Sequence, residues 1–328
     1  MLVVFFRNKS NCIEKKNIEV NDLLPKNTVW IDLIEPRKQE EKYIEQILNI
    51  EAPTEEEMEK FEVISPFYVE KNVNYMTVTI LDKGCKHYPD SIAVTFILTD
   101  SYIITTRYDN PKSFDYIDSW LIRNNNKKCT NGFILTKIIE CIVDCSAEIL
   151  EKVGNEIDTL LKVVFEEPVG KKRKSSGFYD DIIRKIGLTG NIISKNRESI
   201  VSLNRMIIFF SQINNCQYVN RKESRIIIKR VSREISSLSE YATFLSQRNS
   251  FLLDATLGMI SVEQNIIIKV FTVAAAVFMP PTLIASIYGM NFIGMKELQM
   301  EYGYPICIMV IIISAILPYI YFKCKRWL

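Results

Sequence analysis

Two long apolar stretches lie at the C-terminal end of the chain, and no charged residue interrupts either of them. One extends from Val270 to Met295 and the other from Tyr302 to Phe322. A helix needs about 20 apolar residues to cross the hydrocarbon core of a bilayer, so each stretch is long enough to span it. The pattern predicts a helical hairpin in a membrane, with everything upstream outside the bilayer.

The first part of the chain shows a different pattern, in which short apolar or alternating runs are separated by polar residues. Such runs are typical of strands. We expect strands over residues 1–7, 29–33 and 75–81, a hairpin formed by 91–98 and 101–106, and a helix over 38–50. The pattern predicts an α+β domain, with helices around one mixed sheet.

From Gly132 onward the apolar residues recur at helical spacing over long stretches. Two helices are expected over residues 133–165 and 180–213. No proline occurs between Arg221 and Met279, and Gly258 is the only glycine there, so one helix is expected to continue from Arg221 to Tyr288. At 1.5 Å per residue it would be roughly 100 Å long, and it must pack on other helices to be stable. The upstream part would form a stalk and the last third a membrane span.

Composition narrows the possible classes of protein. The chain has 328 residues, a net charge of +2 and 24% charged residues, which is an ordinary soluble composition with a membrane segment appended. Cys141 and Cys145 lie one helical turn apart, but with His87 as the only histidine they indicate core residues rather than a zinc site. No Cys-x-x-Cys pair is present, so we expect no structural zinc and a reducing compartment. The first residues are not expected to be a signal peptide.

A basic run, Lys171–Lys174, separates the two expected stalk helices. It could touch anionic lipid or nucleic acid, but no aromatic residues are interleaved with it, so a solvated turn between helices is favoured and no nucleic-acid partner is expected. The chain also lacks a Gly-rich phosphate loop, a nucleophile elbow and an HExxH motif. We therefore expect no enzyme and no organic cofactor.

One face of the long expected helix carries mostly small, polar or flexible side chains at alternating spacings of three and four residues. We call this face the stripe, and its members are Asp254, Gly258, Ser261, Asn265, Ile268, Thr272, Ala275, Met279, Thr282 and Ser286. Small residues could simply allow two helices to approach closely, or the stripe could line a pore. Pro280 and Pro281 remove two amide donors, which either kinks the helix or frees carbonyls toward a cavity.

The tetrad Tyr288-Gly289-Met290-Asn291 at the end of the first span resembles the signature of the CorA-type magnesium transport family. The Met279-Pro280 pair, the entry Gly303-Tyr304-Pro305 to the second span and the basic end with Trp-Leu are also similar to that family. The loop reads Met295-Lys296-Glu297, whereas family members have proline where Lys296 stands. The likeness is strong over the last quarter of the chain and weaker before it.

This resemblance implies a homopentamer whose first membrane helices surround a central pore. The stripe would then face the axis. The pore-lining or gating residues, which include Phe271 beside the stripe, would be Asn265, Ile268, Phe271, Thr272, Ala275, Met279, Thr282 and Ser286. Rings of Ile268, Phe271 and Met279 would close the pore by excluding water. Gly289, Met290 and Asn291 would form the selectivity filter, where the neutral amide of Asn291 can hydrogen-bond a hydrated Mg²⁺, an ion that dehydrates reluctantly.

Acidic residues outside the filter have expected roles as well. In the outer loop, Glu297 and Glu301 would raise the local cation concentration, and Asp254 would form a carboxylate ring near the inner exit. Family members sense cytosolic Mg²⁺ through acidic residues, and the candidates by rough position are Asp82, Asp90 and Glu234.

Three basic residues follow the second span, at Lys323, Lys325 and Arg326, whereas Lys296 alone lies in the loop. This bias predicts that both termini are cytoplasmic in an inner or plasma membrane. The expected segments are a cytosolic sheet domain 1–130, a stalk 131–265, a first span 266–288, an outer loop 289–303, a second span 304–322 and a basic tail 323–328.

Three functions remain open from the sequence. The first is a divalent-cation channel that carries chiefly Mg²⁺, with Co²⁺ or Ni²⁺ as further ions. The second is a zinc-transporting relative of the same family, which the intact Gly289-Met290-Asn291 and the near absence of histidine disfavour. The third is a membrane-anchored enzyme or receptor, for which no motif was found.

Overall fold

The computed structural model describes residues 1–8, 12–20, 22–58, 66–82, 89–123, 131–166, 177–213, 221–290, 302–325 and 327. They belong to two compact units, Met1–Leu253 and Asp254–Leu328. Helix α6 (Arg221–Tyr288) contributes residues to both units. It has the bounds that the absence of proline and glycine predicted.

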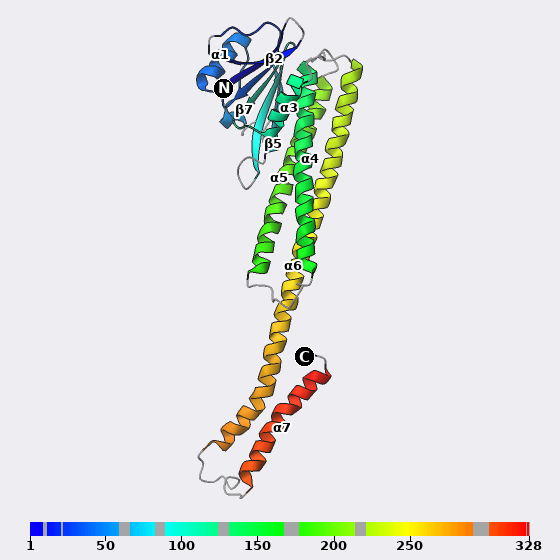
Figure 1. The fold of residues 1–328 in the computed structure, drawn as a ribbon. Coiled ribbons are helices and arrows are strands. Elements are labelled where there is room, and N and C mark those ends of the chain that lie inside the picture. Colours follow the sequence, from blue (N-terminus) through cyan, green and yellow to red (C-terminus); the bar gives the residue numbers. More distant parts are fainter. Residues whose placement is uncertain are drawn as a thin grey trace. The chain divides into compact units, whose positions relative to one another are not determined.

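A seven-stranded mixed sheet forms the N-terminal part of the first unit (Figure 1). Its order is β2-β1-β3-β7-β6-β5-β4, and of the neighbouring pairs only β3 and β7 are parallel. The predicted mixed sheet and the β6–β7 hairpin are confirmed, whereas β2 and β4 were not expected. The strands are β1 (Leu2–Arg7), β2 (Ile13–Ile18), β3 (Thr28–Ile34), β4 (Phe67–Glu70), β5 (Val73–Asp82), β6 (Asp90–Leu98) and β7 (Ile103–Arg107).

Both faces of this sheet are buried. On one face, Val4 belongs to a cluster with Ile44 of α1 (Lys38–Leu48). On the other face, Phe5 stacks on Trp30 with ring centroids 4.3 Å apart, and Trp30 lies 6.3 Å from Phe114 of α3 (Lys112–Arg123). Strands buried on two faces need continuous apolar runs rather than alternation, which explains the run of apolar residues in β1.

A buried ion pair joins the two parallel strands. Nη2 of Arg107 lies 2.8 Å from Oδ2 of Asp32, and both side chains are 3% exposed. Thr105 donates a hydrogen bond of 2.6 Å to Oδ1 of Asp32 and accepts one of 2.9 Å from Nε1 of Trp30. The carboxylate is therefore saturated with donors, which buried charges require.

The stalk of the first unit is formed by α4 (Asn131–Phe165), α5 (Phe178–Ile213) and the first part of α6. Ion pairs link Arg230 of α6 to Glu140 of α4, and Arg248 to Asp158. Between α5 and α6, the hydroxyl of Thr189 donates a hydrogen bond of 2.8 Å to Asn249. The 68 residues of α6 correspond to roughly 100 Å.

Gly154 of α4 lies against the side chain of Tyr241 of α6. A Cβ at Gly154 would lie 2.8 Å from the hydroxyl oxygen of Tyr241, closer than real Cβ atoms come to a neighbour. The small residue therefore allows the aromatic side chain of α6 to reach the backbone of α4.

The second unit contains the last part of α6 and α7 (Gly303–Cys324). Both helices are long and apolar enough to cross a membrane, and α7 has no buried residue. The two-helix hairpin predicted from the charge-free stretches is confirmed. The loop predicted to lie outside the membrane, with Asn291, Lys296, Glu297 and Glu301, falls outside the described residues, as do Cys85, His87 and the basic run Lys171–Lys174.

Candidate functional site

The predicted filter begins where α6 ends. Tyr288 is the last residue of the helix, and the amide of Gly289 still donates a hydrogen bond of 2.9 Å to the carbonyl of Ala285. The amide of Met290 donates to the carbonyl of Ile287 at 3.2 Å. A Cβ at Gly289 would lie 3.1 Å from the Ala285 carbonyl oxygen, so a larger residue would crowd this turn. Asn291 itself falls outside the described part of the chain.

The C-terminal end of α6 is suited to a cation because it carries a partial negative charge. The C-terminus of a helix carries about half a negative charge from its aligned peptide dipoles and unpaired carbonyls. The last turn of α6 contains no basic residue, so the helix does not neutralise this partial charge with its own side chains. The Gly289-Met290 segment therefore starts in a region of negative potential.

The stripe is exposed throughout the second unit. Phe271 is 72% exposed, Met279 69% and Ile268 59%. The other residues predicted to line the pore are exposed too, namely Asn265, Thr272, Ala275, Thr282 and Ser286, and so is Asp254. A single chain thus leaves the whole predicted pore face uncovered.

The opposite face of α6 is the one that this unit covers. Val273 is 7% exposed, and Val277 and Ile284 are partly buried. At 100° per residue, these three side chains lie on the side of the helix opposite Ala275 and Met279. The other helix of the unit is α7 (Figure 1). The packed side of the first span is therefore narrow, and the stripe lies outside it. Residues off the stripe, such as Phe278 and Leu283, are exposed as well.

Two hydroxyl groups of the stripe form hydrogen bonds within the helix. The hydroxyl of Thr272 donates to the carbonyl of Ile268 at 2.8 Å, and that of Thr282 donates to the carbonyl of Phe278 at 2.7 Å. Pro280 and Pro281 lie inside α6, which continues through them. The helix thus tolerates two missing amide donors near the middle of its apolar segment.

The three candidates for a cytosolic metal sensor do not form one cluster. Asp82 and Asp90 are backbone partners at the open end of the β5–β6 pair, and the carboxylate of Asp90 lies 3.1 Å from Nζ of Lys195 on α5. Glu234 lies 3.9 Å from Arg230, which also pairs with Glu140. Among the residues that the structure describes, no group of three acidic, histidine or cysteine side chains is arranged to hold a metal ion.

The cluster around Glu140 was not anticipated from the sequence. Glu140 of α4 pairs with both Arg230 and Lys137 while only 8% of its surface is exposed. Burial and the neighbouring Arg230 lower the pKa of Lys137. The three-residue spacing of Lys137 and Glu140 was a local signal, but Arg230 is 90 residues away from Glu140.

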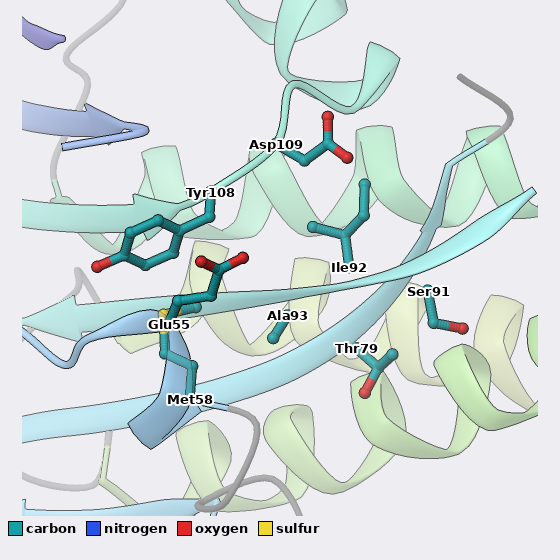
Figure 2. A pocket seen from close by; sticks show the side chains of 8 residues that line it. All are labelled: Glu55, Met58, Thr79, Ser91, Ile92, Ala93, Tyr108 and Asp109. Atoms are coloured by element: carbon teal, nitrogen blue, oxygen red, sulfur yellow. The ribbon is translucent and has the colours of Figure 1, made fainter. Parts of the chain in front are cut away.

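A cavity of about 250 Å³ lies beside the β5–β6 pair, and Figure 2 shows the residues around it. Glu55 and Asp109 contribute carboxylates to its lining, while Thr79 has a buried hydroxyl without a hydrogen-bond partner among the described residues. Tyr108 donates a hydrogen bond of 2.8 Å to Glu41. Burial, followed by this contact, raises the pKa of Tyr108. Sequence reasoning missed this cavity because its residues come from separate elements.

Comparison with known proteins gives concordant matches over the whole chain. The family model described as "CorA-like Mg2+ transporter protein" matches residues 25–326. A magnesium transport protein CorA of Wolinella succinogenes is 33% identical over 307 residues, which cover 92% of each chain. One of Campylobacter jejuni is 30% identical over 340 residues, which cover 100% of both. The CorA magnesium transporter structure from Methanocaldococcus jannaschii has a TM-score of 0.80 at 15% identity, covering 100% of this chain and 99% of its own.

Proposed function

The chain belongs to the CorA-like Mg²⁺ transporter family, and on this basis we propose that it conducts hydrated Mg²⁺ through a central pore formed by five copies of α6. In this arrangement, the stripe of each copy faces the axis. One observation carries the proposal: the small and polar side chains of the stripe lie away from the packed side of Val273, and all of them are exposed.

A pore built from several copies explains why a polar stripe is present in a membrane span. Two helices cannot enclose a water-filled path, and polar groups in contact with lipid are costly. Symmetric neighbours would remove the stripe from lipid and place Asn265, Thr272, Thr282 and Ser286 around water. Ile268, Phe271 and Met279 would be the apolar rings at which the closed pore excludes water.

Selection of Mg²⁺ would take place at Gly289, Met290 and Asn291. Mg²⁺ keeps several of its water ligands, so a ring of neutral Asn291 amides can hydrogen-bond the hydrated ion without trapping it. The negative end of α6 adds favourable potential at the same level. Glu297 and Glu301 would concentrate cations at the outer mouth, partly offset by Lys296, and Asp254 would attract them at the inner one.

Regulation by cytosolic Mg²⁺ would use acidic side chains of the first unit. Asp82 and Asp90 are the favoured pair, since they are backbone partners in adjacent strands. Both termini would lie in the cytoplasm, because the basic residues of the hairpin gather after its second span. Mg²⁺ would thus be both cargo and regulatory ion.

Ion flux into liposomes that contain the purified full chain tests the proposal. Flux of Mg²⁺ should exceed that of Zn²⁺, with Co²⁺ and Ni²⁺ as further permeant ions. A preference for Zn²⁺ over Mg²⁺ would favour the zinc-transporting alternative. Absence of any divalent-cation flux from folded, reconstituted protein would contradict the proposal as a whole.

A further inference from the structure

Cationic and aromatic side chains gather at one end of the second unit. Nζ of Lys269 on α6 lies 5.9 Å from the ring centroid of Trp327, and Nζ of Lys325 lies 6.0 Å from that of Tyr321. The amide of Trp327 donates a hydrogen bond of 3.0 Å to the carbonyl of Phe322, which folds the chain back after α7. We call the cluster of Lys269, Tyr321, Lys323, Lys325 and Trp327 the basic end.

Among the described residues, no acidic side chain pairs with the basic end. The sequence contains no acidic residue after Glu301, and the acidic residue nearest before Lys269 is Glu263. The three lysine side chains are exposed. The cluster therefore presents three exposed lysine side chains without an acidic side chain nearby in the sequence.

The position of these lysines along the helices matches a membrane surface. From Lys269 to Tyr288 there are 19 residue steps, and from Tyr304 to Lys323 there are 19 as well. Each distance corresponds to about 28 Å of helix, close to the hydrocarbon thickness of about 30 Å. Tyrosine and tryptophan favour the same interfacial level, so the basic end has the composition expected where lipid headgroups begin.

We propose that the basic end binds the headgroup of an anionic phospholipid between the ends of α6 and α7. Lysine ammonium groups donate hydrogen bonds to the lipid phosphate, and basic pockets between membrane helices on the cytoplasmic side are suited to such headgroups. The acyl chains lie along the apolar surface of α7, where Ile316 is 47% and Ile320 53% exposed. The inference rests on the membrane placement in the proposed function, but not on the ion pathway.

Charge complementarity selects this lipid over others. A zwitterionic headgroup brings its own ammonium group and no net charge, so it gains little from three lysines. An anionic headgroup carries net negative charge, and each lysine near an anionic surface changes binding by about fivefold. Bound lipid at this level would connect the end of α7 to the start of the first span.

Native mass spectrometry of the full chain tests this inference. The protein is purified in detergent and given equal amounts of phosphatidylglycerol and phosphatidylcholine. We expect wild type to retain phosphatidylglycerol preferentially. The double variant Lys269→Gln/Lys325→Gln should lose roughly fivefold of that preference for each lysine removed, whereas Lys269→Arg/Lys325→Arg should keep it.

Lys152→Gln is the matched control, because Lys152 is 62% exposed on α4 of the first unit. Its preference should equal that of wild type. Equal retention of both lipids by wild type, or an unchanged preference in the glutamine double variant, would overturn the inference. If that double variant does not fold, the single Lys325→Gln after α7 must show the loss. Since retained lipid is measured without ion flux, a failure of the pore proposal leaves this result unaffected.

Discussion

Val273 and Met279 point about 120° apart around α6, and their exposure differs about tenfold, from 7% to 69%. Both are apolar residues in the same membrane span, so hydrophobicity does not account for the difference. The packed position of Val273 belongs to the hairpin of one chain. In the proposed pore, the open position of Met279 faces other copies of the chain.

Replacement of Met279 by alanine tests the gating role of this residue. If a ring of Met279 side chains excludes water from the closed pore, Met279→Ala should lower the barrier to wetting. We expect Mg²⁺ to leak through the variant at high internal Mg²⁺, where the wild-type channel closes. Flux into liposomes and thermal unfolding are measured on the same preparation.

Val273→Ala is the matched substitution on the packed face. Loss of buried side-chain volume should destabilise the hairpin by about 1–3 kcal/mol, without a leak. If Met279→Ala instead lowers the melting temperature and leaves flux unchanged, Met279 packs between helices and does not gate.

The pore proposal predicts how many chains assemble into one complex. The detergent-solubilised protein should be a pentamer by light scattering, because only symmetric neighbours can cover the exposed stripe. A stable monomer or dimer as the sole species would count decisively against a central pore.

The buried ion pair of Asp32 and Arg107 should contribute strongly to the stability of the sheet domain. Arg107→Met leaves the buried carboxylate of Asp32 without its charge partner, which should cost about 3–5 kcal/mol of stability. The fluorescence of Trp30, which is linked to Asp32 through Thr105, reports unfolding. Arg107→Lys keeps the charge and should lose less; equal losses would mean that charge is unimportant here.

The raised pKa of Asp118 predicts that the stability of the folded chain depends on pH. Burial raises the pKa of Asp118. Lys15, whose Nζ lies 2.5 Å from the carboxylate, acts in the opposite direction, but the effect of burial is larger. The folded chain therefore binds this proton more tightly than the unfolded chain, and the contribution of Asp118 to stability improves as pH falls through the raised pKa toward the unfolded value of about 3.9. At neutral pH the ionised form costs stability.

Asp118→Asn should accordingly raise the melting temperature at neutral pH, and the gain should disappear in mild acid. The comparison of wild type and variant at each pH removes the contribution of other titrating groups. A variant less stable than wild type at neutral pH would mean that the ion pair with Lys15 outweighs burial.

The long elements were predictable because their signals are local. The lack of proline from Arg221 to Met279 predicted the long course of α6, which continues through Pro280 and Pro281 to Tyr288. The absence of charge predicted the two apolar helices. The expected hairpin between β6 and β7 is present. The strand β2, by contrast, reads Ile13-Glu14-Lys15-Lys16-Asn17-Ile18, with polar residues at its centre. It pairs with the preceding strand β1 at the sheet edge, where its four central residues are exposed, so it lacks the apolar pattern of the inner strands.

The parts of the site that escaped prediction depend on contacts between distant residues. Glu140 and Arg230 meet only because α4 packs on α6, and the cavity of Glu55 and Asp109 is assembled from separate elements. The regulatory candidates Asp82, Asp90 and Glu234 were chosen by rough position, and only the first two are neighbours. Charge alone does not specify which carboxylates come together.

Flux through the Asn291→Ala variant tests the central claim most directly. Asn291 offers the only side-chain amide in the tetrad, so its removal should abolish Mg²⁺ uptake into liposomes while the protein still assembles as wild type does. Asn155→Ala, at an exposed position of α4, is the control and should conduct normally. Wild-type flux through a folded Asn291→Ala assembly would contradict selection of hydrated Mg²⁺ at this residue.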